Sequence, residues 1–165
     1  MFEVGSFNFN HKNIALLVNA ESKVGLSPIS TLRDKFPELI NKYRDSKLEV
    51  GKLEIIEADG INFFLIPYKK YYKDIFDYEC YINIASCLKD IEKVMKNNTQ
   101  INDIFFYKMD IEESNWFSIS SIINWYLLLT KDTTIITTEY KITRLDRELE
   151  VFFLDNLETV ISNRI

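Results

Sequence analysis

The segment YKKYYKD, residues 68–74, brings together lysines and tyrosines whose side chains could do chemistry. A lysine such as Lys69 acts as a nucleophile only where its surroundings keep the amine neutral. The simpler interpretation is a solvated basic and aromatic patch. Tyrosine-rich surfaces also supply rigid contact area for protein recognition, so Tyr71, Tyr72 and Lys73 are candidates for binding a protein partner.

A short acidic segment offers a second set of reactive groups. Asp110, Glu112 and Glu113 follow one another closely, and one of these carboxylates could serve as a general base. Such segments are more often simply solvated. Trp116 comes next, and a tryptophan in this position is most simply a core residue.

Asn19 ends the apolar run IALLVN, and its amide has both a donor and an acceptor that could hold a ribose or orient a water. Asparagine at a strand end also commonly caps the turn that follows. That turn contains Gly25 and then Leu26-Ser27-Pro28. A backbone that approaches a phosphate closely needs φ values that glycine adopts at little cost. With one glycine, this turn is a phosphate-binding loop, a degraded one or an ordinary connection.

Composition limits the class of protein. The chain has 165 residues, 47% of them hydrophobic, which fits a single globular domain over residues 1–165. A net charge of −5 disfavours non-specific binding to nucleic acid. We expect no membrane partner, because no apolar run approaches the roughly 20 residues that span a bilayer. The first residues, MFEVGSFNFN, do not resemble a signal peptide, so we expect a cytoplasmic protein.

Metal and disulfide chemistry are not expected. Cys80 and Cys87 lie seven residues apart in one helical pattern, which places them on the same helix face but too far apart to form a disulfide. We expect both to be buried free thiols. His11 is the only histidine, so a cysteine and histidine zinc site cannot be assembled. No metal and no cofactor are predicted.

Several strands must position these residues. IALLV, residues 14–18, is apolar at every position, as in a central strand covered on both faces. Two further strands, LEIIEA and INFFLIPY, are joined at Asp59-Gly60, which suits a tight antiparallel hairpin. The predicted remaining strands are residues 2–10, 101–109 and 133–142.

Helical spacing separates the strands. Apolar residues recur every three to four positions after Pro28, with a break at Pro37, and again between Phe76 and Met95. A loop at 110–116 precedes a helix at about 118–129, and a closing helix is predicted at 144–163. Alternating strands and helices predict an α/β fold of three layers, with helices on both faces of a mixed sheet.

The order of these elements resembles the macrodomain fold over residues 3–140. It is most similar to the branch that holds the DNA ADP-ribosylation antitoxins and the terminal ADP-ribose-protein glycohydrolases. Their first loop, V-N-x-V-N-x-x-G-x-M-G-x-G-I-A, is matched here by Val18-Asn19-Ala20 and Gly25, and their later F-P by Phe36-Pro37. Ser22 replaces the second asparagine, and the glycine-rich part is shortened.

Two further motifs support the resemblance. The family's P-T-K appears as Pro67-Tyr68-Lys69, which keeps the lysine that is a nucleophile in some members. The family's G-C-G-x-x-x-L-x-W appears as KMDIEESNW, which keeps Trp116 and loses the glycines. Glu112 falls where glycohydrolases carry a catalytic aspartate.

The resemblance implies an ADP-ribose-type nucleotide as the ligand and Lys69 and Glu112 as the catalytic pair. The ligand-binding residues that it implies are Asn19, Gly25, Ser27, Pro67, Tyr68 and Trp116. The lost glycines favour a degenerate protein: a non-catalytic scaffold or protein-binding pseudoenzyme, such as a viral or mobile-element counter-defence factor in the host cytoplasm. The alternative is a protein that binds ADP-ribose or a related NAD-derived nucleotide and hydrolyses ADP-ribosyl bonds.

Overall fold

The structure, a computed structural model, describes residues 2–4, 11–25, 28–98, 100–101, 103–109, 111–127 and 134–137. The elements of this part of the chain alternate between strands and helices. In order they are β1 (Phe2–Val4), β2 (Asn13–Asn19), the 3-10 helix η1 (Pro28–Leu32), α1 (Pro37–Asp45), β3 (Glu54–Ala58), β4 (Ile61–Lys69), α2 (Tyr78–Asn97), β5 (Asp103–Tyr107), α3 (Glu113–Leu127) and β6 (Thr134–Thr137).

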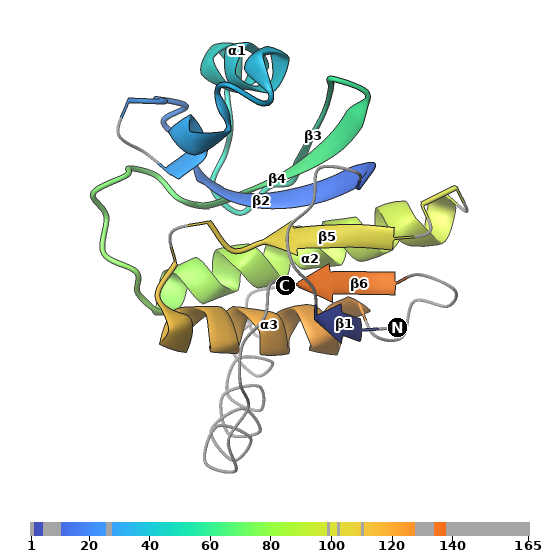
Figure 1. Ribbon diagram of the computed structural model, residues 1–165. Helices are drawn as coiled ribbons and strands as arrows, with labels where there is room; N and C mark the ends of the chain where they lie inside the picture. The colour runs from blue at the N-terminus through green and yellow to red at the C-terminus, as the bar shows by residue number, and fades with distance from the viewer. Residues whose placement is uncertain are drawn as a thin grey trace.

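The strands form one six-stranded sheet in the order β1-β6-β5-β2-β4-β3 (Figure 1). β2 lies inside the sheet and pairs in parallel with β4 on one side and β5 on the other. β3 is antiparallel to β4, so the sheet is mixed. The interior position predicted for residues 14–18 is confirmed, because all seven residues of β2 are buried.

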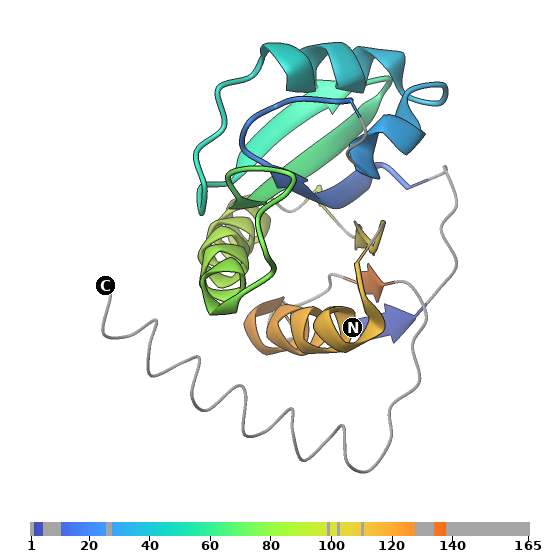
Figure 2. The same ribbon diagram turned by 90° about the vertical axis from the view of Figure 1, so that its left-hand side faces the viewer.

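Helices cover both faces of the sheet, with α1 on one side and α2 and α3 on the other (Figure 2). Alternate residues of β2 supply the two faces: Ala15 and Leu17 pack with α2 and α3, whereas Ile14 and Leu16 pack with α1 and η1. Both hydrophobic clusters therefore share one sheet, and the predicted three-layer α/β fold is confirmed.

Local sequence explains several element boundaries. Asp59 and Gly60 adopt positive φ angles of 54° and 75° in the turn between β3 and β4, as the predicted hairpin requires. Pro37 occupies the first turn of α1, where its missing N–H costs nothing. Asp77 caps α2 by accepting a hydrogen bond from the Cys80 amide. Among the described helices, none is both long and apolar enough to cross a membrane.

The start of α3 differs from the prediction. We expected a loop to residue 116, but α3 begins at Glu113, because the Trp116 amide already donates to the Glu112 carbonyl oxygen at 2.8 Å. No proline or glycine in this stretch opposes a helix. The predicted closing helix at 144–163 lies outside the described residues, as do residues 5–10 of the first predicted strand and the part of the last strand beyond Thr137.

Candidate functional site

The carboxyl ends of β2, β4 and β5 meet at one edge of the sheet. Asn19 at the end of β2 is paired with Lys69 at the end of β4. The pairing continues beyond the strands, because the Ala20 amide donates to the Lys69 carbonyl and the Glu21 amide to the Lys70 carbonyl, both at 2.9 Å. Ligands of open α/β sheets collect at this edge, outside the strand ends. We call it the carboxyl edge.

Asn19 is 4% exposed and is held from the α1 side of the sheet. The Tyr43 hydroxyl donates to the Asn19 carbonyl oxygen at 2.8 Å and to the side-chain Oδ1 at 2.9 Å. Burial, together with Glu21 and Tyr68, raises the pKa of Tyr43. The hydroxyl therefore keeps its hydrogen and stays a donor at neutral pH.

Lys69 closes the turn that follows β4. Its Nζ donates to the carbonyl oxygens of Tyr72 at 2.9 Å and Asp74 at 3.3 Å. The same nitrogen lies 5.3 Å from the centroid of the Tyr68 ring and 5.9 Å from that of Tyr72, within the range of cation–π attraction. These contacts hold the Lys69 side chain in the turn. To act as a nucleophile, Nζ would have to break them.

Two carboxylates complete this turn. The Tyr71 amide donates to Asp74 Oδ2 at 2.9 Å, and the Tyr72 amide donates to Glu21 Oε1 at 3.2 Å. Glu21 belongs to the turn after β2, so the turns that follow β2 and β4 are fastened to each other by side chains as well as by backbone. The backbone of residues 70–74 is thus fixed, although its tyrosines point outward.

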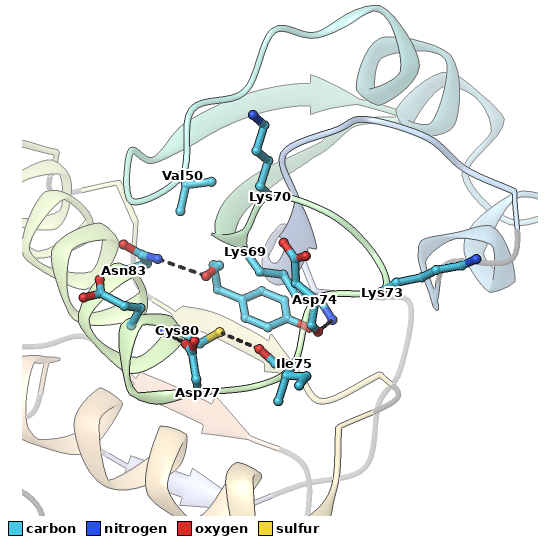
Figure 3. A pocket seen from close by; sticks show the side chains of 11 residues that line it. Val50, Lys69, Lys70, Lys73, Asp74, Ile75, Asp77, Cys80 and Asn83 are labelled. Carbon is cyan, nitrogen blue, oxygen red and sulfur yellow. Dashed lines mark hydrogen bonds between the residues drawn. The ribbon is translucent and has the colours of Figure 1, made fainter.

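A cleft of about 470 Å³ lies beside the end of β4 (Figure 3). Its lining includes Val50, Tyr68, Lys69 and, from the start of α2, Cys80 and Asn83. Asn83 Nδ2 donates to the Tyr68 carbonyl oxygen at 3.1 Å. Tyr68 and Lys69 are predicted site residues, whereas no lining residue comes from the turn after β2 or from residues 111–116. The cleft therefore overlaps the predicted site only at the end of β4.

Cys80 in this cleft is not an activated nucleophile. Burial, the largest cause, raises the pKa of its thiol, and Sγ lies 3.9 Å from the Ile75 carbonyl oxygen. Figure 3 shows the Lys70 and Lys73 side chains directed away from the other labelled residues. Neither of these lysines is therefore brought to bear on the thiol.

Comparison with known proteins identifies the fold. No family model matches the sequence, and no curated protein matches it. Solved structures do. The macrodomain of Thermus aquaticus DarG matches with a TM-score of 0.70 and 15% identity, over 85% of this chain and 99% of that one. The chain has the macrodomain fold.

Two other structures agree with this assignment. The macrodomain of Mycobacterium tuberculosis DarG matches with a TM-score of 0.66 and 15% identity, over 85% of this chain and 99% of that one. Thermosipho africanus DarTG in complex with ADP-ribose matches with a TM-score of 0.65 and 19% identity, over 87% of this chain and 42% of that one. The resemblance to macrodomains near the DarG branch, which the sequence motifs suggested, holds at the level of the fold.

The two predicted catalytic residues belong to strand ends on opposite sides of β2. Lys69 ends β4, and Glu112 follows β5 and precedes α3. Two strand spacings, about 10 Å, separate β4 from β5. Glu112 is exposed, and its neighbour Glu113 forms an ion pair with Lys108. The acidic segment is thus partly neutralised by a lysine of the same connection.

Two predicted ligand-binding residues belong to the core cluster on the α2 and α3 face of the sheet. Trp116 is fully buried in the cluster formed by α2 and α3, the core position that we kept as its simpler interpretation. Tyr68, which we had counted with the exposed tyrosines, is 9% exposed and packs in the same cluster. The pairing of β2 and β4 explains Tyr68: Val18 pairs with Pro67 and Asn19 with Lys69, so Tyr68 is the extra residue of a bulge.

The remaining predicted contacts are less defined. Pro67 is buried in β4, and its carbonyl oxygen accepts from the Gly51 amide at 2.9 Å. Gly25 is exposed with a φ of 34°. Ser27 lies outside the described residues. Of the residues predicted to bind the nucleotide, Asn19 is the best defined. Strand pairing places it at the carboxyl edge, and the Tyr43 hydroxyl of α1 holds its side chain.

Sequence reasoning missed three residues that organise the carboxyl edge. They are Tyr43, Glu21 and Asn83, and each acts on a group far away in the sequence or on a backbone atom. The helical pattern could have identified Tyr43. It shares the buried face of α1 with Leu39 and Ile40, and its hydroxyl is the one polar side-chain group on that face. Nothing in the sequence marks Glu21 or Asn83.

Proposed function

We propose that this macrodomain binds an ADP-ribose-type nucleotide at the carboxyl edge without hydrolysing it. The observation that carries the proposal is the state of Lys69, whose Nζ donates to two carbonyl oxygens of its own turn. The solved structure of Thermosipho africanus DarTG, which has the same fold, contains ADP-ribose and supports the choice of ligand class.

Positioning argues against hydrolysis. Attack on a ribose needs the reacting atoms about 3–3.5 Å apart, and such positioning can supply roughly 7–11 kcal/mol of the barrier. Lys69 is turned toward the Tyr72 and Asp74 carbonyls, and Glu112 follows β5, which lies on the other side of β2 from β4. Binding of a nucleotide through Asn19 and backbone amides does not require Lys69 or Glu112 to approach the ribose.

The test combines binding with turnover. We expect heat of binding when free ADP-ribose is titrated into the wild-type protein, and no release of ADP-ribose from modified DNA or modified protein above the buffer rate. Lys69→Ala and Glu112→Ala are measured beside it, with Lys70→Ala as the control for loss of an adjacent lysine. Turnover abolished by Lys69→Ala or Glu112→Ala would contradict the non-catalytic part, and no heat at millimolar ADP-ribose would contradict the binding part.

A second candidate function is recognition of a protein partner by the turn after β4. Tyr71 and Tyr72 are 47% and 39% exposed, and Ile75 is 83% exposed. Their backbone is fixed by Lys69, Asp74 and Glu21, so a partner would not need to order it. Double substitution of Tyr71 and Ile75 by Ser should abolish partner binding under this function and leave ADP-ribose binding unchanged.

A further inference from the structure

We infer that Tyr43 is a positioning residue that makes Asn19 a hydrogen-bond donor, so that the carboxyl edge recognises an oxygen acceptor of its ligand. The inference rests on the proposed function and deepens it, because it names the chemistry that Asn19 offers. Tyr43 itself does not touch the ligand: it is fully buried in the α1 layer.

The Tyr43 hydroxyl uses both oxygen atoms of Asn19. It lies 2.8 Å from the backbone carbonyl oxygen and 2.9 Å from Oδ1, as in a three-centre hydrogen bond. An asparagine amide has one acceptor oxygen and one NH₂ donor group. With Oδ1 directed at Tyr43, the NH₂ group is the part of the side chain left for a ligand.

Among the residues that the structure describes, the Nδ2 atom of Asn19 has no hydrogen-bond partner. It is also not one of the fully buried side-chain atoms that lack a partner, which in this part of the chain are Trp116 Nε1 and Ser120 Oγ. The small exposed fraction of Asn19 is therefore available at the end of β2, where the strand meets the carboxyl edge.

The end of α1 is fastened to the same turn at a second point. Ser46 Oγ donates to the Tyr43 carbonyl oxygen at 2.6 Å, and Ser22 Oγ lies 3.2 Å from Ser46 Oγ. Ser22, which replaces the second asparagine of the family motif, thus faces α1 and not the ligand. Asn19 and Ser22 are both tied to residues 43–46, which fixes the angle at which the Asn19 amide leaves β2.

The ligand group that fits this donor is an oxygen with a free lone pair. A phosphate oxygen qualifies, and so does a ribose hydroxyl whose own hydrogen is donated to another group. A carboxylate in place of the amide would repel the lone pair of either. Asn19→Asp is therefore the sharpest variant, because it keeps the size of the side chain and an acceptor for the Tyr43 hydroxyl while removing the donor.

The experiment is calorimetric titration of ADP-ribose into the full chain and four variants: Tyr43→Phe, Asn19→Ala, the double variant and Asn19→Asp. A hydrogen bond to a ligand is worth about 5–10-fold in affinity. We expect Tyr43→Phe to weaken binding by about this factor in the wild type and to have no effect in the Asn19→Ala background. Asn19→Asp should weaken binding at least as much as Asn19→Ala, and thermal unfolding checks that each variant folds.

The outcomes separate this inference from the proposed function. Absence of binding to the wild type would overturn the proposed function, and this inference with it. If the wild type binds, the Tyr43 inference is overturned when Tyr43→Phe weakens binding equally in both backgrounds, which is the result of a merely structural role. Wild-type affinity in Asn19→Asp would show that Asn19 accepts from the ligand, and would overturn the inference as well.

Discussion

Burial keeps several ionisable side chains next to the sheet in their neutral form. Tyr43 on α1 and Cys87 on α2 are each fully buried, and burial is the largest cause that raises the pKa of both. For Cys87 the pKa rises from 9.0 to about 12, with Asp90 as the second cause. A thiol of this kind packs as a small apolar group and does not react.

The raised pKa of Cys87 predicts a loss of stability in alkali. Its folded pKa lies above its unfolded value, so the unfolded state releases its proton first, and stability is full below about pH 9 and falls between pH 9 and 12. Between pH 8 and 10 we expect the free energy of unfolding of the wild type to fall by about 1 kcal/mol more than that of Cys87→Ala. Chemical denaturation at each pH measures both.

Cys87→Ala is the matched control because the other described groups whose pKa is raised, Cys80, Tyr43, Tyr81 and Lys52, titrate in both proteins. The variant loses packing at every pH, so only the change of the difference with pH is informative. A difference that stays constant from pH 8 to 10 would show that the Cys87 thiol ionises in the folded protein as easily as in the unfolded one.

At the scale of secondary-structure elements, the turns on either side of β3 help to place β4 in the sheet. Gly60 lies in the hairpin between β3 and β4 with a φ of 75°, and Gly51 precedes β3 with a φ of 81°. A Cβ at Gly60 would have nothing within 4 Å, whereas a Cβ at Gly51 would lie 3.2 Å from Asn83 Oδ1. Both glycines adopt a positive φ, but only a side chain at Gly51 would contact another residue.

This contrast predicts different costs for two alanine substitutions. Gly60→Ala carries only the strain of the positive φ, about 1–2 kcal/mol. Gly51→Ala carries the same strain and also pushes Asn83, whose Nδ2 holds the Tyr68 carbonyl. We expect Gly51→Ala to lower the free energy of unfolding by about 1 kcal/mol more than Gly60→Ala. Equal costs, or a larger cost at Gly60, would mean that Asn83 moves freely and does not hold β4.

At the scale of the whole molecule, local patterns predicted the fold well. The unbroken apolar run of residues 14–18 predicted the interior strand, and Asp59-Gly60 predicted the hairpin, because each is a property of adjacent residues. The start of α3 was wrong, since polar residues 113–115 carry no apolar periodicity. Tyr68 was expected at the surface, because a bulge cannot be read from alternation alone.

The candidate site was less predictable than the fold. Sequence motifs identified Asn19 and Lys69, and strand pairing places both at the carboxyl edge. What each side chain does there depends on distant partners: Tyr43 is 24 residues from Asn19, and Glu21 is 51 residues from Tyr72. Such contacts follow from the packing of layers, which a single sequence does not specify.

One measurement tests the central claim most directly: titration of ¹⁵N-labelled protein with ADP-ribose, followed by two-dimensional NMR. We predict saturable shifts of the amides that follow the ends of β2, β4 and β5, namely residues 20–25, 69–72 and 108–113, together with the side-chain amide of Asn19. The amides of Val50 and of residues 77–83, which line the cleft away from the end of β4, should shift less. No shifts at millimolar ADP-ribose, or shifts confined to Val50 and residues 77–83, would contradict nucleotide recognition at the carboxyl edge.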